Sequence, residues 1–212
     1  VGGPVGSGKL DGSAEAAGML PSPYRPLQYR EDVIVSMPNG VGATERLHLL
    51  AYRLGEIVAG QGQIVIPTGI LEVVAAVDST HARATLMKKF EDVFVGNQVV
   101  VFDTLSMPQG VFPTRVEFGT STRIAWSFNS PTLASSGHKM IFAAGAASGL
   151  VAGDQLSIRS APSTDDAAPG DIEIGVAQVT RVTQWGVSAV LIEALDGGIV
   201  TGLRAQISAK MP

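Results

Sequence analysis

Short apolar runs separated by turn residues fill the chain from residue 32 onward. Runs rich in Val, Ile and other strand-forming residues lie at 33–35, 63–66, 70–77, 82–87 and 98–102. These residue types favour strands, because branched and apolar side chains pack well on a pleated sheet. Turn residues follow several runs, as in the segments 38–40 (PNG) and 67–69 (PTG). The pattern predicts an all-β fold with minor helix.

One stretch, 44–54, leaves its secondary structure open. Its apolar residues Leu47, Leu50, Ala51 and Leu54 have the i, i+3, i+4, i+7 spacing of a helix, with Thr44 as a possible N-cap. The same stretch also suits a strand.

The second half of the chain repeats the pattern of the first. Residues 69–73 (GILEV) align with 175–179 (GVAQV) at an offset of 106 residues, and six further pairs keep that offset or one residue less. These pairs are Val93 with Ile199, Gly96 with Gly202, Val101 with Ile207, Val77 with Val182, Ala84 with Ala189 and Leu86 with Leu191. Upstream, 57–61 (IVAGQ) resembles 150–154 (LVAGD) at an offset of 93, which we explain by extra residues around 161–171. We infer an internal duplication.

Each copy is predicted to form a small unit of antiparallel strands. One hairpin is explicit, because 174–183 leads to a turn at 184–186 and 187–193 returns. Short strands of this kind close into barrels, because closure removes unpaired edges. We therefore predict two tandem related small β-barrel or sandwich-like units, at residues 32–125 and 126–212.

Residues 1–31 are predicted to form an extended N-terminal arm. The segment is rich in Gly, Pro, Ser and Ala, and Pro21, Pro23 and Pro26 disfavour a helix. The arm is either disordered alone or ordered by packing on a neighbour. Because the chain starts at Val1 rather than Met, we expect that a targeting segment was removed or that the chain belongs to a longer protein.

Composition narrows the function classes. Hydrophobic residues make up 45% of the 212 residues, which excludes a wholly disordered chain. The formal net charge of −4 argues against a broad surface for nucleic acid or anionic membranes. The chain has no Cys, which excludes disulfides, thiolate catalysis and zinc–thiolate sites. The most apolar stretch, 64–77, is too short to span a membrane.

Two segments match catalytic motifs only in part. Residues 3–10 (GPVGSGKL) fit a P-loop except at the last position, where Leu stands in place of the Ser or Thr that holds magnesium. Ser136 and Lys139 fit Ser-x-x-Lys, and Ser127 and Asn129 fit Ser-x-Asn, the patterns of penicillin-recognising enzymes. Their order here is reversed, and the Lys-Thr-Gly triplet is missing. We predict no catalytic and no cofactor-binding residue.

The three histidines, His48, His81 and His138, are far apart in the sequence. Each is predicted to be a surface or hydrogen-bonded residue rather than a metal ligand. A Ser–His–Asp arrangement stays open, because triads form in space rather than in sequence.

A local acidic cluster and a few aromatic residues are the last candidates. The cluster, which we predict to be a solvated loop rather than a calcium site, contains Asp165, Asp166, Asp171 and Glu173. No metal ligand is predicted. The aromatic residues, which suit either sugar stacking or core and interface packing, are Tyr24, Tyr29, Trp126, Phe128 and Trp185.

Four blocks of the sequence carry a resemblance to a known family. They are residues 2–10 (GGPVGSGKL), 62–74 (GQIVIPTGILEVV), 174–183 (IGVAQVTRVT) and 210–212 (KMP). Together they resemble the C-terminal β-rich region of LysM peptidoglycan-binding domain-containing proteins of environmental bacteria. The resemblance implies an exported protein in which a signal sequence and a LysM module, which binds N-acetylglucosamine-containing glycan, precede this region. It implies no enzyme activity, and no LysM motif occurs in these 212 residues.

Two hypotheses follow for the function. The first is a non-enzymatic, exported module of the cell envelope with a structural or interaction role, attached to cell-wall glycan through a LysM module outside this chain. The second is a self-assembling subunit of an extracellular filament or surface layer, which polymerises by adding its N-terminal arm to a neighbour's sheet. We expect no nucleic acid, no membrane span and no cofactor in either case.

Overall fold

The computed structural model describes residues 4–14, 25–103, 110–129, 132–160 and 171–212. Regular structure in this part of the chain is strand, apart from one 3-10 helix, η1 (Ala146–Ser148). No helix within the described ranges is long and apolar enough to cross a membrane. The chain divides into two compact units, residues 1–57 with 63–104 and residues 58–62 with 105–212. The prediction of an all-β, two-unit fold is confirmed.

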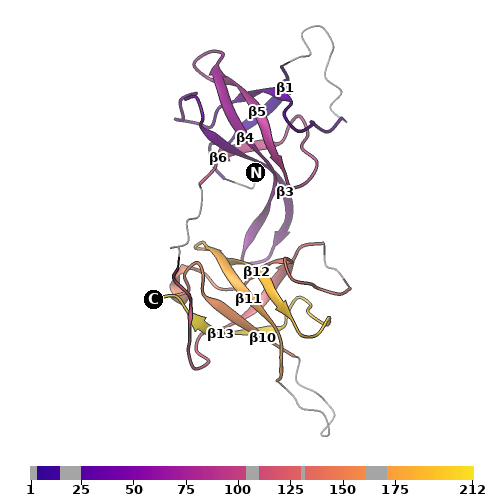
Figure 1. Cartoon of the computed structure of the whole chain (residues 1–212), viewed down its shortest axis with the longest axis vertical. Helices are drawn as coiled ribbons and strands as arrows, with labels where there is room; N and C mark the ends of the chain where they lie inside the picture. Colours follow the sequence, from indigo (N-terminus) through magenta and orange to yellow (C-terminus); the bar gives the residue numbers. More distant parts are fainter. Residues whose placement is uncertain (1–3, 15–24, 104–109, 130–131, 161–170) are drawn as a thin grey trace. The chain divides into compact units, whose positions relative to one another are not determined.

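The first unit is a closed antiparallel barrel (Figure 1). Its strands are β1 (Gly8–Ser13), β2 (Asp32–Ser36), β3 (His48–Val58), β4 (Gly62–Ala76), β5 (His81–Lys89) and β6 (Gln98–Val101). They follow each other around the ring in the order β1-β2-β5-β4-β3-β6, and β6 pairs with β1. The stretch 44–54, open in the sequence, becomes strand from His48 onward.

The second unit contains seven strands in the described residues. They are β7 (Thr114–Arg115), β8 (Ser121–Ser127), β9 (Lys139–Phe142), β10 (Gln155–Arg159), β11 (Glu173–Val182), β12 (Val187–Ala194) and β13 (Arg204–Lys210). Their order is β10-β11-β12-β9-β8-β13-β7, and an additional pairing joins β10 to β13. That pairing closes six of the strands into a ring. The seventh, the short β7, pairs with the end of β13.

The two rings have the same topology. Replacing β1 to β6 in chain order by β8 to β13 converts the first ring order into the second. The register also shifts at equivalent places, at Ile70/Leu71 and Val73/Ala75 in the β4–β5 ladder and at Val176/Ala177 and Val179/Arg181 in the β11–β12 ladder. Such a shift leaves one residue unpaired and redirects the strand, so two shared shifts are specific marks of a common origin. The inferred duplication is confirmed by this agreement.

The first change of offset, by one residue, lies in the turn that follows β4 and β11. In the first unit, residues 77–81 connect the paired residues Ala76 and Ala82. In the second, residues 183–186 connect Val182 and Val187. The turn of the second unit is therefore one residue shorter, which lowers the offset from 106 to 105, and the offset is 106 again at Val93 and Ile199.

The predicted match between 57–61 and 150–154 is wrong. Gly153 donates its backbone N–H to the Val179 carbonyl (2.8 Å), and the equivalent bond in the first unit runs from Arg46 to Val73 (2.8 Å). Residues 150–154 thus correspond to residues 43–47, whereas 57–61 lie at the end of the β3–β4 hairpin. The two segments look alike because each contains a Gly with positive φ, at Gly60 and Gly153.

The predicted arm and domain boundary also need correction. Residues 8–13 form β1 inside the first barrel, and Leu27 is buried in its core. Arg30 donates its backbone N–H to the Leu86 carbonyl, as Gly137 does to Leu191 in the second unit. Residues 25–31 are thus the counterpart of 132–138 and belong to the repeat. The boundary lies at 104/105 rather than 125/126, since β8 pairs inside the second unit. Residues 1–3 and 15–24 of the arm lie outside the described residues.

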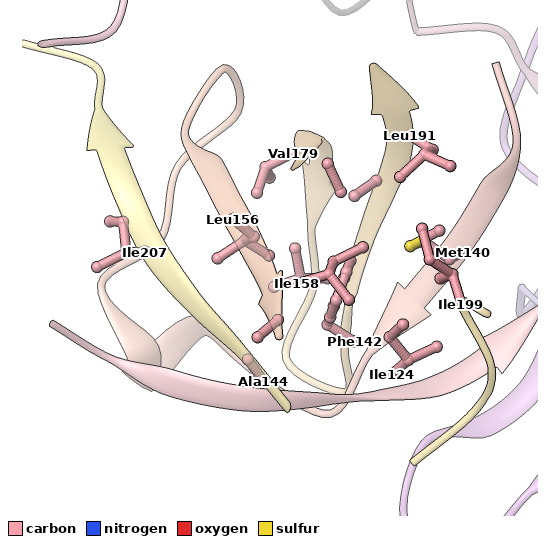
Figure 2. Packing of buried hydrophobic residues seen from close by; sticks show 14 of the residues in the cluster. Ile124, Met140, Phe142, Ala144, Leu156, Ile158, Val179, Leu191, Ile199 and Ile207 are labelled. Carbon is pink, nitrogen blue, oxygen red and sulfur yellow. The ribbon is translucent and has the colours of Figure 1, made fainter. Parts of the chain in front are cut away.

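Each barrel has its own apolar core. Alternate residues of the strands point inward, as the period of two requires. In the second unit, Figure 2 shows inward side chains such as Ile124, Phe142 and Ile158 meeting in the interior. The first unit buries an equivalent set that includes Leu10, Val35 and Leu71. Burial of these apolar side chains supplies the main stabilising term for each ring.

Candidate functional site

Two arginines lie directly opposite each other on the outside of the second barrel. Arg123 of β8 and Arg204 of β13 are cross-strand partners, and both are exposed. They line a shallow groove of about 380 Å³ together with Ser121, Thr122 and Ala143. Like charges placed opposite each other destabilise an antiparallel pair. Neither ring closure nor core packing requires two arginines at these positions.

Hydrogen bonds hold both guanidinium groups at the groove. Arg204 Nε donates to Ser121 Oγ (3.0 Å), and Arg123 Nη1 donates to the Gly202 carbonyl (3.1 Å). Most N–H donors of each planar guanidinium remain available for a ligand. Across the residues that the structure describes, no Asp or Glu carboxylate forms an ion pair with Arg123 or Arg204.

The same place in the first barrel is built differently. There the cross-strand partners are Lys9 of β1 and Gln98 of β6. The Tyr52 hydroxyl donates to Gln98 Oε1 (2.7 Å) and shares a further hydrogen bond with Ser7 Oγ (2.5 Å). In the first unit Gln98 is therefore bonded to a neighbouring side chain and Lys9 is the one exposed cation of the pair, whereas the second unit presents two arginines.

The sequence motifs of catalytic type are brought together only in part. Ser127 Oγ lies 2.8 Å from His138 Nε2, because β8 and β9 are neighbours in the ring. Burial lowers the pKa of His138 below its ordinary value of 6.5, which favours the neutral imidazole. Ser136 instead donates to the Ile192 carbonyl (3.1 Å). Within the described ranges, no carboxylate hydrogen-bonds to His138, so the pair has no third member there.

Each of the other two histidines lies beside a carboxylate side chain. His48 Nε2 lies 3.2 Å from Glu72 Oε2, and His81 Nδ1 lies 2.9 Å from Asp78 Oδ2. No group of three or more potential metal ligands occurs among the described residues.

The acidic cluster is described only in part. Asp165 and Asp166 lie outside the described residues. Asp171 pairs with Arg159, whose Nε lies 3.3 Å from the Asp171 carboxylate, and Glu173 begins β11. The part that the structure describes therefore includes a cation, which the sequence pattern did not indicate.

The aromatic candidates have separate surroundings. Trp126 and Phe128 pack edge to face with centroids 6.0 Å apart. Trp185 is 60% exposed in the turn between β11 and β12, and Tyr29 is 58% exposed beside Arg30. Tyr24 lies outside the described residues. The P-loop-like segment ends in strand β1 rather than a helix, so it offers no helix N-terminus to a phosphate.

Sequence reasoning missed Arg123 and Arg204, because they are 81 residues apart and only the register of β8 and β13 makes them partners. A repeat alignment that included residues 8–13 would have placed Arg123 over Lys9, but it gives no signal that Arg123 and Arg204 are partners. Comparison of the chain with protein-family models, with curated proteins and with solved structures finds no match.

Proposed function

We propose that this chain is a non-enzymatic, exported structural and interaction module of a LysM-type, peptidoglycan-associated cell-envelope protein. The resemblance in four sequence blocks supports the envelope assignment. The observation that carries the interaction role is the divergence of the two barrels at one outer position. The ring and core are kept in both copies, while Arg123 and Arg204 stand where the first barrel has Lys9 and Gln98, of which Gln98 accepts a hydrogen bond from Tyr52.

Divergence of this kind fits a scaffold that carries a contact surface. Function on a duplicated fold resides in side chains placed on it rather than in the fold itself. A closed ring has no free strand edges, so partners of the barrels must be recognised through outward side chains. Cell-wall glycan would be bound by the LysM module outside this chain, and the groove would contact a further envelope component.

Retention on purified peptidoglycan tests the proposal. The parent protein, with and without its LysM module, is incubated with washed sacculi, and the bound fraction is measured after centrifugation. We expect the complete parent to be retained and the version without the LysM module to be retained less. Failure of the complete parent to bind, or its recovery in the cytoplasmic fraction of the source cells, would overturn the proposal.

A second candidate is self-assembly into a filament or surface layer through residues 1–31. The observation in its favour is that β1, which lies in this segment, is the strand that closes the ring against β6 and the residues before it. Because β1 is part of its own barrel, assembly of this kind requires copies to exchange β1 as a swapped strand.

A cross-link that fixes β1 tests this mechanism. The chain has no Cys, so K9C/S36C introduces one defined pair between cross-strand partners of β1 and β2. We expect the oxidised variant to stay monomeric and the reduced variant to polymerise, as seen by negative-stain imaging. Polymers of the oxidised variant would refute strand exchange.

A further inference from the structure

We propose that the groove between Arg123 and Arg204 binds a carboxylate group. This inference rests on the proposed function, because it names the ligand class of the interaction surface. The two arginines are cross-strand partners that line one groove, and hydrogen bonds to Ser121 and Gly202 hold their guanidinium groups. A planar guanidinium donates two parallel N–H bonds to a carboxylate, which suits a groove bordered by two such groups.

The repulsion between the arginines gives the site its driving force. In the described part of the chain, neither arginine has an acidic partner. An anion placed between the two side chains replaces repulsion by two attractive, charge-assisted contacts. Because the chain carries a net charge of −4, attraction comes from this local pair rather than from the charge of the whole molecule.

The lining favours a carboxylate over a phosphate. Phosphate sites in proteins draw on backbone N–H groups of helix N-termini or successive turn residues. Here the groove lies on strands, where the Ala143 N–H is already bonded to the Arg123 carbonyl (2.9 Å). The donors left to a ligand are side-chain guanidinium groups, together with the Ser121 hydroxyl. The site is open to solvent, so we expect roughly millimolar affinity that weakens with salt.

The first barrel supplies the test variants. Arg204→Gln introduces the residue type of Gln98, and Arg123→Lys that of Lys9, so both changes suit this topology. Arg181→Gln removes an exposed positive charge from β11, away from the groove, and serves as the matched control.

The experiment is an NMR titration of the ¹⁵N-labelled full chain with sodium glutarate at constant ionic strength. We expect saturable shifts at the amides of residues 121–123, 143 and 204, with affinity reduced about tenfold in R204Q. R123K, which keeps the charge and loses the planar fork, should also bind more weakly, and R181Q should bind like the unmodified chain. The spectrum itself reports folding, and R123K decides the matter if R204Q does not fold.

Several outcomes would overturn the inference. The first is chemical shifts that do not saturate with glutarate. The second is that R204Q and R123K bind glutarate as tightly as the unmodified chain does. The third is that inorganic phosphate binds more tightly than glutarate. Retention of the parent on peptidoglycan without glutarate binding would remove this inference alone. Glutarate binding without retention would remove the envelope proposal alone.

Discussion

At the scale of single residues, two equivalent glycines lie where neighbouring segments approach too closely for a side chain. A Cβ on Gly69 would lie 2.7 Å from the Lys88 carbonyl oxygen and 3.0 Å from Val93 Cγ2. A Cβ on Gly175 would lie 2.9 Å from the Glu193 carbonyl oxygen and 2.8 Å from Ile199 Cδ1. The same neighbours recur in both barrels, and the backbone oxygens cannot move without disturbing the ladder. Glycine is required here by space rather than by backbone conformation.

Alanine at Gly69 should therefore destabilise the first barrel. We expect Gly69→Ala to lower the free energy of unfolding by about 1 to 3 kcal/mol, the usual cost of overpacking. Urea unfolding followed by circular dichroism measures the change. Gly42→Ala is the matched control, because a Cβ there meets nothing within 4 Å. Equal stability of the two variants would show that the barrel relaxes around the added methyl group.

Residue-scale features could be predicted from the sequence only where the repeat exposed them. Gly69 and Gly175 stood out because they align at a fixed offset. Tyr52 did not, because its partners Ser7 and Gln98 are distant in sequence and its own counterpart in the second unit is Arg159. Side chains that act in pairs need the register of the strands, which hydrophobic periodicity does not supply.

At the scale of elements, the turns that follow β4 and β11 use the same device with different chemistry. Asp78 Oδ1 accepts hydrogen bonds from the backbone N–H groups of Thr80 (2.7 Å) and His81 (2.8 Å). In the second unit, Thr183 Oγ1 accepts them from Trp185 (3.2 Å) and Gly186 (3.0 Å). A side-chain oxygen bonded two and three residues ahead stabilises such turns. Only the first turn carries a charge.

This difference predicts a dependence on pH. Hydrogen bonds from the Thr80 backbone and hydroxyl, and then from His81, lower the pKa of Asp78 from 3.8 to about 2. Because the folded state favours the carboxylate, its contribution is present above pH 3.8 and is lost as the pH falls towards 2. We expect Asp78→Ala to lower the midpoint of thermal unfolding of the first barrel at pH 7. The difference in midpoint between this variant and the unmodified chain should shrink as the pH falls from 4 to 2.

The second turn supplies the control. Thr183→Ala removes equivalent hydrogen bonds without removing a charge, so its effect on the midpoint should not vary over the same pH range. A difference between the unmodified chain and D78A that stays constant down to pH 2 would mean that the carboxylate does not stabilise the turn through its charge.

The sequence predicted those strands that are rich in β-branched and apolar residues, and it did not predict a strand that lacks them. The hairpin at 174–193 was predicted because β-branched residues flank a clear turn. Strand β1 was missed, because its sequence GKLDGS contains a single large apolar residue, Leu10. Ring closure with β2 and β6 overrides that weak local preference, since tertiary pairing outweighs intrinsic strand propensity.

At the scale of the whole molecule, each barrel has what independent folding requires. Each ring closes on itself through its own strands, so its edge groups are paired without help from the other. Each also has a separate buried apolar cluster. We therefore expect two cooperative units rather than one, each with its own free energy of unfolding.

Separate fragments test this independence. We expect fragments 1–104 and 110–212 each to unfold cooperatively, and the calorimetric trace of the whole chain to be near the sum of the two. In the whole chain, Gly69→Ala should shift only the transition assigned to the first barrel, and Gly175→Ala only that assigned to the second. The reason is that each added Cβ meets atoms of its own barrel. A fragment without a cooperative transition would show that the duplicated barrels depend on each other for stability. In that case the residues at Arg123 and Arg204 would have changed in a chain whose two barrels fold together.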